Sequence, residues 1–246
     1  MRTALSLAIW GYLALSSIAL FFVALAIWLA TLPFDRNGRV LHLFTCWWSA
    51  HYFWVNPLWK LRVDGVGYAD RRRAYVIVAN HQSLGDILAV AGTYLPFKWV
   101  SKKSVFKVPF IGWNCTLNRY VPIVRGDKDS ADRMFAACRR WIERGVSVVL
   151  FPEGTRSPDG EIRDFKMGAF KIAHETGAPI LPIVVDGTRD ALPKHGWVLR
   201  ESLVARVRVL PPITPRPGDA PEATAALVRS IMVDELAQLR GRRAAA

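Results

Sequence analysis

The segment AYVIVANHQSLGD, residues 74–86, contains the pattern that decides the fold. It begins with an apolar, β-branched run that is typical of a buried strand, and it continues through a polar turn into a helical pattern. The expected strands are 75–79, 98–101, 120–124, 147–151, 180–185 and 204–210, and the expected helices are 83–94, 130–144, 166–176 and 222–239. This alternation predicts an α/β fold with a mostly parallel sheet flanked by helices.

His81 follows the first of these strands directly, at the edge where open α/β sheets place their sites. Asp86 falls in the first turn of the next helix, so it can bond one imidazole nitrogen and leave the other free to take a proton. No Ser or Cys stands nearby in a nucleophile-elbow setting, which favours a substrate hydroxyl as the nucleophile. The alternative is purely structural, because Ser83 and Asp86 also match a helix-capping pattern.

The segment FPEGTRS, residues 151–157, follows another expected strand and should emerge at the same edge of the sheet. Gly154 admits a positive φ and lets backbone N–H groups approach an anion. Arg156 supplies a planar fork that suits phosphate. An ordinary surface turn is the alternative for this segment alone. Together, the two strand ends predict a base and a phosphate site side by side.

The N-terminal segment predicts a membrane anchor. Residues 3–34 contain no charged side chain, and as one helix of about 48 Å they exceed the bilayer core of about 30 Å. They also exceed the apolar core of a signal peptide, about 7–15 residues, so we expect the segment to be retained. The aromatic-rich residues 40–61 predict a second helix at the headgroup level. We therefore expect two membrane-anchoring helices in residues 1–60, and an α/β domain with a C-terminal helix in residues 61–246.

The composition points to a membrane surface. The chain has 246 residues, 52% of them hydrophobic, with 10 Trp and a net charge of +13. A basic body is attracted to an anionic leaflet. We expect no nucleic-acid partner, because the basic–aromatic motifs of nucleic-acid readers are missing from the sequence. The cysteines Cys46, Cys115 and Cys138 have no spacing typical of a disulfide framework or a metal site.

The two loop segments resemble conserved blocks of one enzyme family. NHQSLGD is similar to the NHxxxxD block, and FPEGTRS to the FPEGTRS block, of the glycerolipid acyltransferases, the lysophospholipid acyltransferase family. Residues 102–113 resemble the stretch before the family's second block, in which Arg125 matches the Arg and Arg119 stands at the usual Gly position. Pro182 matches the fourth block. The resemblance covers about residues 61–212 and is strongest to members that acylate 1-acylglycerol 3-phosphate.

The resemblance implies a membrane-bound O-acyltransferase. His81 would deprotonate the sn-2 hydroxyl of lysophosphatidic acid, and Asp86 would orient His81. The alkoxide would attack the thioester of acyl-CoA or acyl-carrier protein and give phosphatidic acid. The implied substrate-binding residues are Lys102, Arg125, Glu153, Gly154, Thr155 and Arg156. The resemblance also implies no metal, no cofactor beyond the thioester co-substrate, an acyl tunnel toward the N-terminal helices, and an active site that faces the cytoplasm.

Two alternatives stay open at this point. The acceptor could be another lysolipid, either a lysophospholipid with a head group or a lyso-ornithine lipid, because the sequence does not define a head-group pocket. A protein of a different class, a non-catalytic membrane-binding protein, would also account for the apolar segment, the aromatic residues and the basic body.

Overall fold

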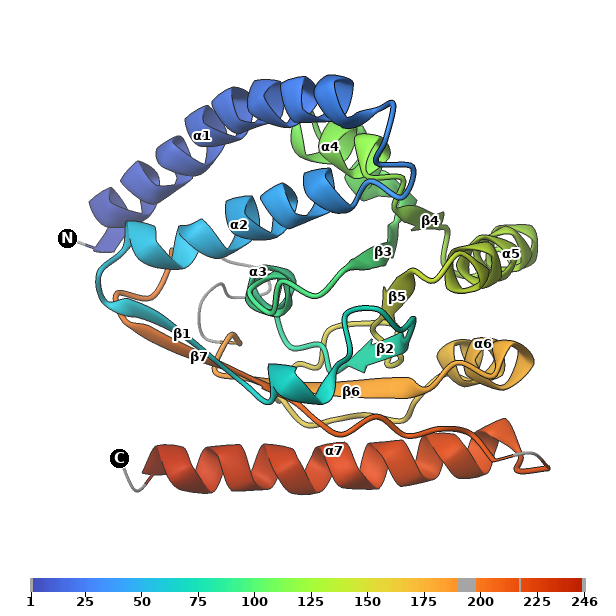
Figure 1. Ribbon diagram of the computed structural model, residues 1–246. Coiled ribbons are helices and arrows are strands. Elements are labelled where there is room, and N and C mark those ends of the chain that lie inside the picture. Colours follow the sequence, from blue (N-terminus) through green and yellow to red (C-terminus); the bar gives the residue numbers. More distant parts are fainter. Residues whose placement is uncertain (1, 190–197, 217, 245–246) are drawn as a thin grey trace.

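Within residues 2–189, 198–216 and 218–244, which the computed structural model describes, the chain forms a seven-stranded sheet with helices on both faces (Figure 1). The strands are β1 Trp59–Asp64, β2 Val76–Ala79, β3 Phe97–Lys102, β4 Val121–Ile123, β5 Ser147–Leu150, β6 Ile180–Asp186 and β7 Leu203–Val209. Their order in space is β1-β7-β6-β2-β5-β3-β4. Neighbouring strands are parallel except β6 and β7, so the expected mostly parallel sheet is confirmed.

The helices form a layer on each face of this sheet. They are α1 Arg2–Thr31, α2 Arg39–Val55, α3 Gly85–Ala91, α4 Ile111–Leu117, α5 Lys128–Glu143, α6 Gly168–Thr176 and α7 Pro221–Ala244, with short 3-10 helices η1 Val66–Tyr68 and η2 Lys103–Lys107. Helices α5, α6 and α7 pack on one face, and α2 and α3 pack on the other. Helix α1 lies outside α2 and α4, at the top of the molecule in Figure 1.

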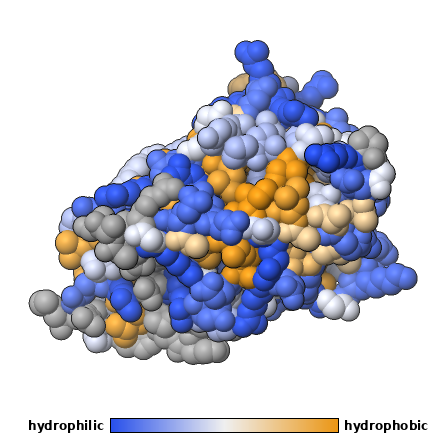
Figure 2. Space-filling view, turned by 90° about the horizontal axis from the view of Figure 1, so that it is seen from below, coloured by the Kyte–Doolittle hydropathy of each residue, from blue (hydrophilic) through white to orange (hydrophobic). Residues whose placement is uncertain are grey.

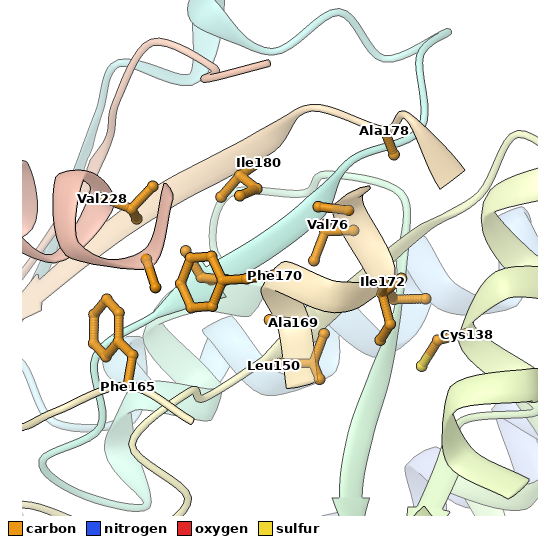
Figure 3. Packing of buried hydrophobic residues seen from close by; sticks show 14 of the residues in the cluster. Val76, Cys138, Leu150, Phe165, Ala169, Phe170, Ile172, Ala178, Ile180 and Val228 are labelled. Atoms are coloured by element: carbon orange, nitrogen blue, oxygen red, sulfur yellow. The ribbon is translucent and has the colours of Figure 1, made fainter. Parts of the chain in front are cut away.

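Alternation along the strands separates the two cores. On β2, Val76 and Val78 face α5, α6 and α7, whereas Ile77 and Ala79 face α2 and α3. Figure 3 shows Val76 in the first core, together with side chains from β6, α6 and α7. Phe170 is fully buried there, and truncating such a phenylalanine to alanine costs about 3–5 kcal/mol. The sheet that positions the loops is therefore packed against a buried hydrophobic core on this face.

Each expected strand and helix of the α/β region is present, with ends that differ by a few residues. Helix α3 ends at Ala91 rather than at residue 94, because the Thr93 hydroxyl donates to the Val90 carbonyl and Tyr94 adopts a φ of 52°. In the described residues, four elements are additional to the expected ones: helix α4, the 3-10 helices η1 and η2, and strand β1, which follows the Asn56-Pro57 break.

The two N-terminal helices differ in their surroundings. In the described part of the chain, one helix, over Thr3–Thr31, is long and apolar enough to cross a membrane, and only 17% of its most apolar window is buried. Helix α2 instead has many buried side chains, and its Phe53 belongs to the core between the sheet and helices α2 and α3. The structure thus shows one helix that could cross a membrane, and a second anchoring helix at the headgroup level stays a prediction. The division at residue 60 stays a prediction, since β1 already begins at Trp59.

Exposed apolar side chains are concentrated at the N-terminal end of the chain. Most of the exposed large hydrophobic residues fall between Leu5 and Leu58. The face seen from the α7 side is mostly hydrophilic around a central apolar patch (Figure 2). The molecule therefore has an apolar side made chiefly by α1 and a more polar side made by α7.

Candidate active site

The carboxyl ends of five neighbouring strands form the candidate site. The register pairs Val78 with Leu150, so the two loops that follow β2 and β5 emerge side by side, as expected. β6, on the other flank of β2, leads to Thr188, while β3 ends at Lys102 and β4 is followed by Arg125. The sheet order thus brings together residues that are far apart in the sequence.

His81 and Asp86 form a hydrogen-bonded pair at this edge. The Nδ1 of His81 lies 2.8 Å from Oδ2 of Asp86, and the Asp86 side chain is fully buried. The same oxygen accepts backbone N–H groups of Gln82 at 2.6 Å and Ser83 at 2.8 Å. The Thr188 hydroxyl donates to the other oxygen, Oδ1. Asp86 therefore both holds the loop and orients the imidazole. The catalytic and the helix-capping interpretations of its position in the sequence are compatible.

This arrangement leaves one imidazole nitrogen for chemistry. The Asp86 carboxylate can only accept a hydrogen bond, so Nδ1 of His81 must be the donor and must carry the proton. Among the described residues, Nε2 of His81 has no hydrogen-bond partner. An unprotonated Nε2 beside a fixed carboxylate can take a proton from a hydroxyl group.

The second loop holds His81 in place from the other side. Oε1 of Glu153 accepts the His81 backbone N–H at 2.8 Å, and Oε2 accepts that of Arg163 at 3.2 Å. The Ser157 N–H donates to the His81 carbonyl at 2.7 Å. Burial raises the pKa of the Glu153 carboxyl, and the two backbone donors oppose that shift. Glu153 is buried and joins the two loops, which is consistent with the expected site-shaping role.

A cavity of about 430 Å³ adjoins this loop, and we call it the cationic cavity. Its wall includes the predicted residues Lys102, Arg125 and Gly154, together with Lys128 and Lys166, for which no role was predicted. A phosphate group fits such a wall. Its oxygens can be approached by the planar guanidinium of Arg125, by the ammonium group of Lys102 and by the backbone of the turn at Gly154.

Three predicted residues of this loop do not line the cationic cavity: Glu153, which bonds the His81 backbone instead, Thr155 and Arg156. Thr155 is exposed and Arg156 is half-buried, and neither contributes to the cavity wall. Arg119, at the position where the resembling family has glycine, keeps a left-handed φ of 55°. Its guanidinium packs over the ring of Trp141, 5.9 Å from the centroid. Arg119 therefore adopts the left-handed backbone conformation that glycine would allow at this position. Its side chain lies on Trp141 and does not line the cationic cavity.

A second cavity of about 530 Å³ lies beneath the N-terminal helices, and we call it the apolar cavity. It is lined by α1 and α2 through residues such as Leu13 and Trp48, by Leu88 of α3 and by Trp99 of β3. Its volume is in the range of pockets that hold small ligands, about 300–1,000 Å³. The expected opening toward the N-terminal helices thus corresponds to an apolar space that can take a hydrocarbon chain.

No metal-binding cluster stands out in the residues that the structure describes, where no group of three or more His, Cys, Asp or Glu side chains could hold an ion.

Comparisons with known proteins agree with this fold. The chain belongs to the acyltransferase family, whose model, described as Acyltransferase, matches residues 60–186. It is 37% identical over 165 residues, 66% of its length, to a chloroplastic 1-acyl-sn-glycerol-3-phosphate acyltransferase of Brassica napus, and it spans about half, 47%, of that relative. It is 29% identical to the enzyme of the same name from Pseudomonas aeruginosa over 225 residues, covering 88% of this chain and 83% of the relative.

A solved structure shows the same fold over nearly the whole chain. The crystal structure of the 1-acyl-sn-glycerophosphate acyltransferase PlsC from Thermotoga maritima superposes with a TM-score of 0.81 and covers 98% of each chain. At 24% identity, this likeness supports the architecture, including the placement of the N-terminal helices over the sheet, and the family membership rests on the sequence match.

Proposed function

We propose that this acyltransferase moves a fatty acyl group from an acyl thioester to the sn-2 hydroxyl of lysophosphatidic acid, giving phosphatidic acid. The observation that carries the proposal is the hydrogen-bonded His81–Asp86 pair, whose direct neighbours line two cavities: Phe151, stacked on His81, lines the cationic cavity, and Ile87, next to Asp86, lines the apolar cavity. Lysophosphatidic acid has one phosphate and one hydrocarbon chain, which match the two cavities. The names of the relatives from Brassica napus and Pseudomonas aeruginosa support the same acceptor.

The reaction follows from general base catalysis. Nε2 of His81 takes the proton of the sn-2 hydroxyl as its oxygen attacks the thioester carbonyl, so that a C–O bond forms and the C–S bond then breaks. The imidazolium returns its proton to the departing thiolate. Asp86 stabilises the imidazolium and keeps Nε2 directed at the substrate. A positioned base of this kind contributes about 10²–10⁴-fold to the rate.

The phosphate of the acceptor would lie in the cationic cavity. Lys102 and Arg125 provide the charges, Gly154 lets the turn approach, and Glu153 holds that turn against the His81 backbone. Arg156 and Thr155 belong to the same loop and are proposed as substrate-binding residues at its rim. The hydrocarbon chain would occupy the apolar cavity. Acyl-CoA and acyl-carrier protein both provide the thioester that the mechanism needs.

Helix α1 is proposed to keep the enzyme at the membrane, with the active site on the cytoplasmic side, where thioester donors occur. Its exposed residues are apolar along most of its length. A lysolipid acceptor then reaches the apolar cavity without leaving the bilayer surface, because α1 forms one wall of that cavity.

The test is an acceptor panel with purified protein in detergent and oleoyl-CoA as donor. Products from lysophosphatidic acid, lysophosphatidylcholine and a lyso-ornithine lipid are identified by mass spectrometry. We expect phosphatidic acid as the main product, with the new acyl group at sn-2. A main product from either of the other acceptors would replace the proposed substrate, and the assay is repeated with acyl-carrier protein as donor before a lack of product counts against the function.

A further inference from the structure

Lys166 lies directly against the glycine turn of the FPEGTRS loop. Gly154 has a φ of +72°, and a Cβ atom added there would lie 2.8 Å from Cε and 2.9 Å from Nζ of Lys166. Gly154 therefore does more than permit the turn. It leaves the space in which the ammonium group of Lys166 rests, beside the cavity that both residues line.

The position of Lys166 is set by the fold rather than by its own flexible side chain. Its backbone N–H donates to the Pro152 carbonyl at 2.8 Å, and the N–H of Arg163 donates to Glu153. The preceding residue, Phe165, is buried in the core that α6 and α7 share (Figure 3). Two backbone hydrogen bonds and one buried ring thus tie this segment to the catalytic loop.

The cationic cavity has more positively charged side chains on its wall than a ligand with a single negative charge would need. Lys102, Arg125, Lys128 and Lys166 line it. Among the described residues that line it, Asp127 is the one carboxylate; its Oδ1 accepts the Ser130 N–H at 2.8 Å, and it offsets one of these four positive charges. Within the described residues, no ion pair joins Lys166 to a carboxylate. Complementarity therefore favours a ligand that carries more than one negative charge.

We propose that Lys166 is a specificity-determining residue that selects acceptors with a terminal phosphomonoester over lysolipids whose phosphate is esterified to a head group. A phosphomonoester carries about −1.5 to −2 charges at pH 7 and has three free oxygens. A phosphodiester carries one charge and has only two free oxygens, so it can meet fewer of the cations that line the cavity. A cationic head group would in addition be repelled by the cavity. This inference rests on the proposed function and assigns its acceptor selectivity to one residue.

The test compares Lys166→Gln with Lys171→Gln, a matched control that removes an exposed lysine of α6, five residues further along the chain. For each, kcat and KM are measured with lysophosphatidic acid and with lysophosphatidylglycerol. We expect Lys166→Gln to lower the ratio of the two kcat/KM values about tenfold, mainly through KM for lysophosphatidic acid. The control should keep the ratio of the unchanged protein, and Lys166→Arg should retain most of it. An unchanged ratio in Lys166→Gln, or an equal loss with both acceptors, would overturn the proposal.

A binding measurement separates this inference from the proposed reaction. A lysophosphatidic acid analogue without the sn-2 hydroxyl cannot be acylated there, and its affinity is measured by calorimetry in detergent. Weaker binding to Lys166→Gln than to Lys171→Gln supports the phosphate role of Lys166 even if no acceptor is turned over. Equal binding to the two variants contradicts it even if the acyltransferase reaction is observed.

Discussion

The ring of Phe151 lies nearly flat against the imidazole of His81, with the ring centroids 4.1 Å apart and the planes 17° apart. Trp99 stacks on Phe151 in turn, with centroids 5.7 Å apart. Phe151 lines the cationic cavity and Trp99 lines the apolar one. This row of rings connects His81 to the walls of both cavities, with Phe151 as its direct neighbour and Trp99 one ring further away.

Replacing Phe151 with leucine should lower kcat and leave KM for lysophosphatidic acid nearly unchanged. Leucine preserves an apolar side chain of similar bulk but removes the flat contact that restricts rotation of the imidazole. Aromatic pairs contribute about 0.5–1.5 kcal/mol, which corresponds to a decrease of roughly two- to tenfold in rate. Steady-state kinetics in detergent measure both constants. A raised KM with normal kcat would mean that Phe151 contacts the acceptor rather than positions the base.

Thr188 should prove necessary for full activity although it lies far from His81 in the sequence. Thr188→Val keeps the shape of the side chain but removes the donor to Oδ1 of Asp86, at a fully buried position. An unsatisfied buried oxygen costs about 1–3 kcal/mol. We therefore expect a lower melting temperature and about a tenfold lower kcat. Thr188→Ser retains the hydroxyl and is the control. Equal activity of the valine and serine variants would show that this hydrogen bond does not position Asp86.

The positions of the strands and of the His81–Asp86 pair could be predicted from the sequence, because each depends on local pattern. Apolar runs that end in polar turns define strand ends, and parallel strands place those ends at one edge. The strand β1 was missed because the aromatic residues before it continue into Trp59, and its parallel pairing with β7 depends on residues more than 140 positions away. A strand that pairs with a strand far away in the sequence is therefore hard to recognise from its own residues alone.

The rest of the candidate site needed the structure for the same reason. Thr188 reaches Asp86 because β6 neighbours β2, which no spacing within either segment indicates. Lys166 follows the FPEGTRS loop closely, but its proximity to Gly154 depends on how the chain returns to the Pro152 carbonyl. A basic residue shortly after a glycine turn was the one available signal, and by itself it is common on protein surfaces.

Arg125 and Arg156 should differ in their effects on acceptor binding. Arg125 is on the wall of the cationic cavity and Arg156 is not. We expect Arg125→Gln to raise KM for lysophosphatidic acid about tenfold, since hydrogen bonds to charged groups contribute about 1.5–3 kcal/mol and exposure weakens them. Arg156→Gln should raise it by a smaller factor. Both variants should keep kcat within a few-fold of the unchanged protein. An unchanged KM in Arg125→Gln would remove that residue from the phosphate site.

Lys98 should make stability depend on pH above neutrality. Burial, followed by the nearby Arg119, lowers the pKa of Lys98 to about 7, and Asp35 opposes the shift. Between about pH 10 and pH 7 the unfolded chain then binds more protons than the folded chain, so the free energy of unfolding decreases as the pH falls. The slope from this residue reaches about 1.4 kcal/mol per pH unit.

Lys98→Met removes that contribution. Urea unfolding of both proteins in detergent at pH 7, 8 and 9 gives the difference in unfolding free energy at each pH. We expect the lysine protein to gain stability relative to the methionine variant as the pH rises. A difference that stays constant over this range would show that the Lys98 ammonium is not destabilised by its surroundings.

The central claim is that His81 is the general base of an acyl transfer to lysophosphatidic acid. The most direct test measures thiol release from oleoyl-CoA by the unchanged protein, His81→Ala and Asp86→Asn, with and without lysophosphatidic acid, after circular dichroism has confirmed that each is folded. We expect acceptor-dependent thiol release that is abolished in His81→Ala and reduced about 10²–10⁴-fold in Asp86→Asn. Substantial acceptor-dependent release by folded His81→Ala would contradict the role of His81 as the general base.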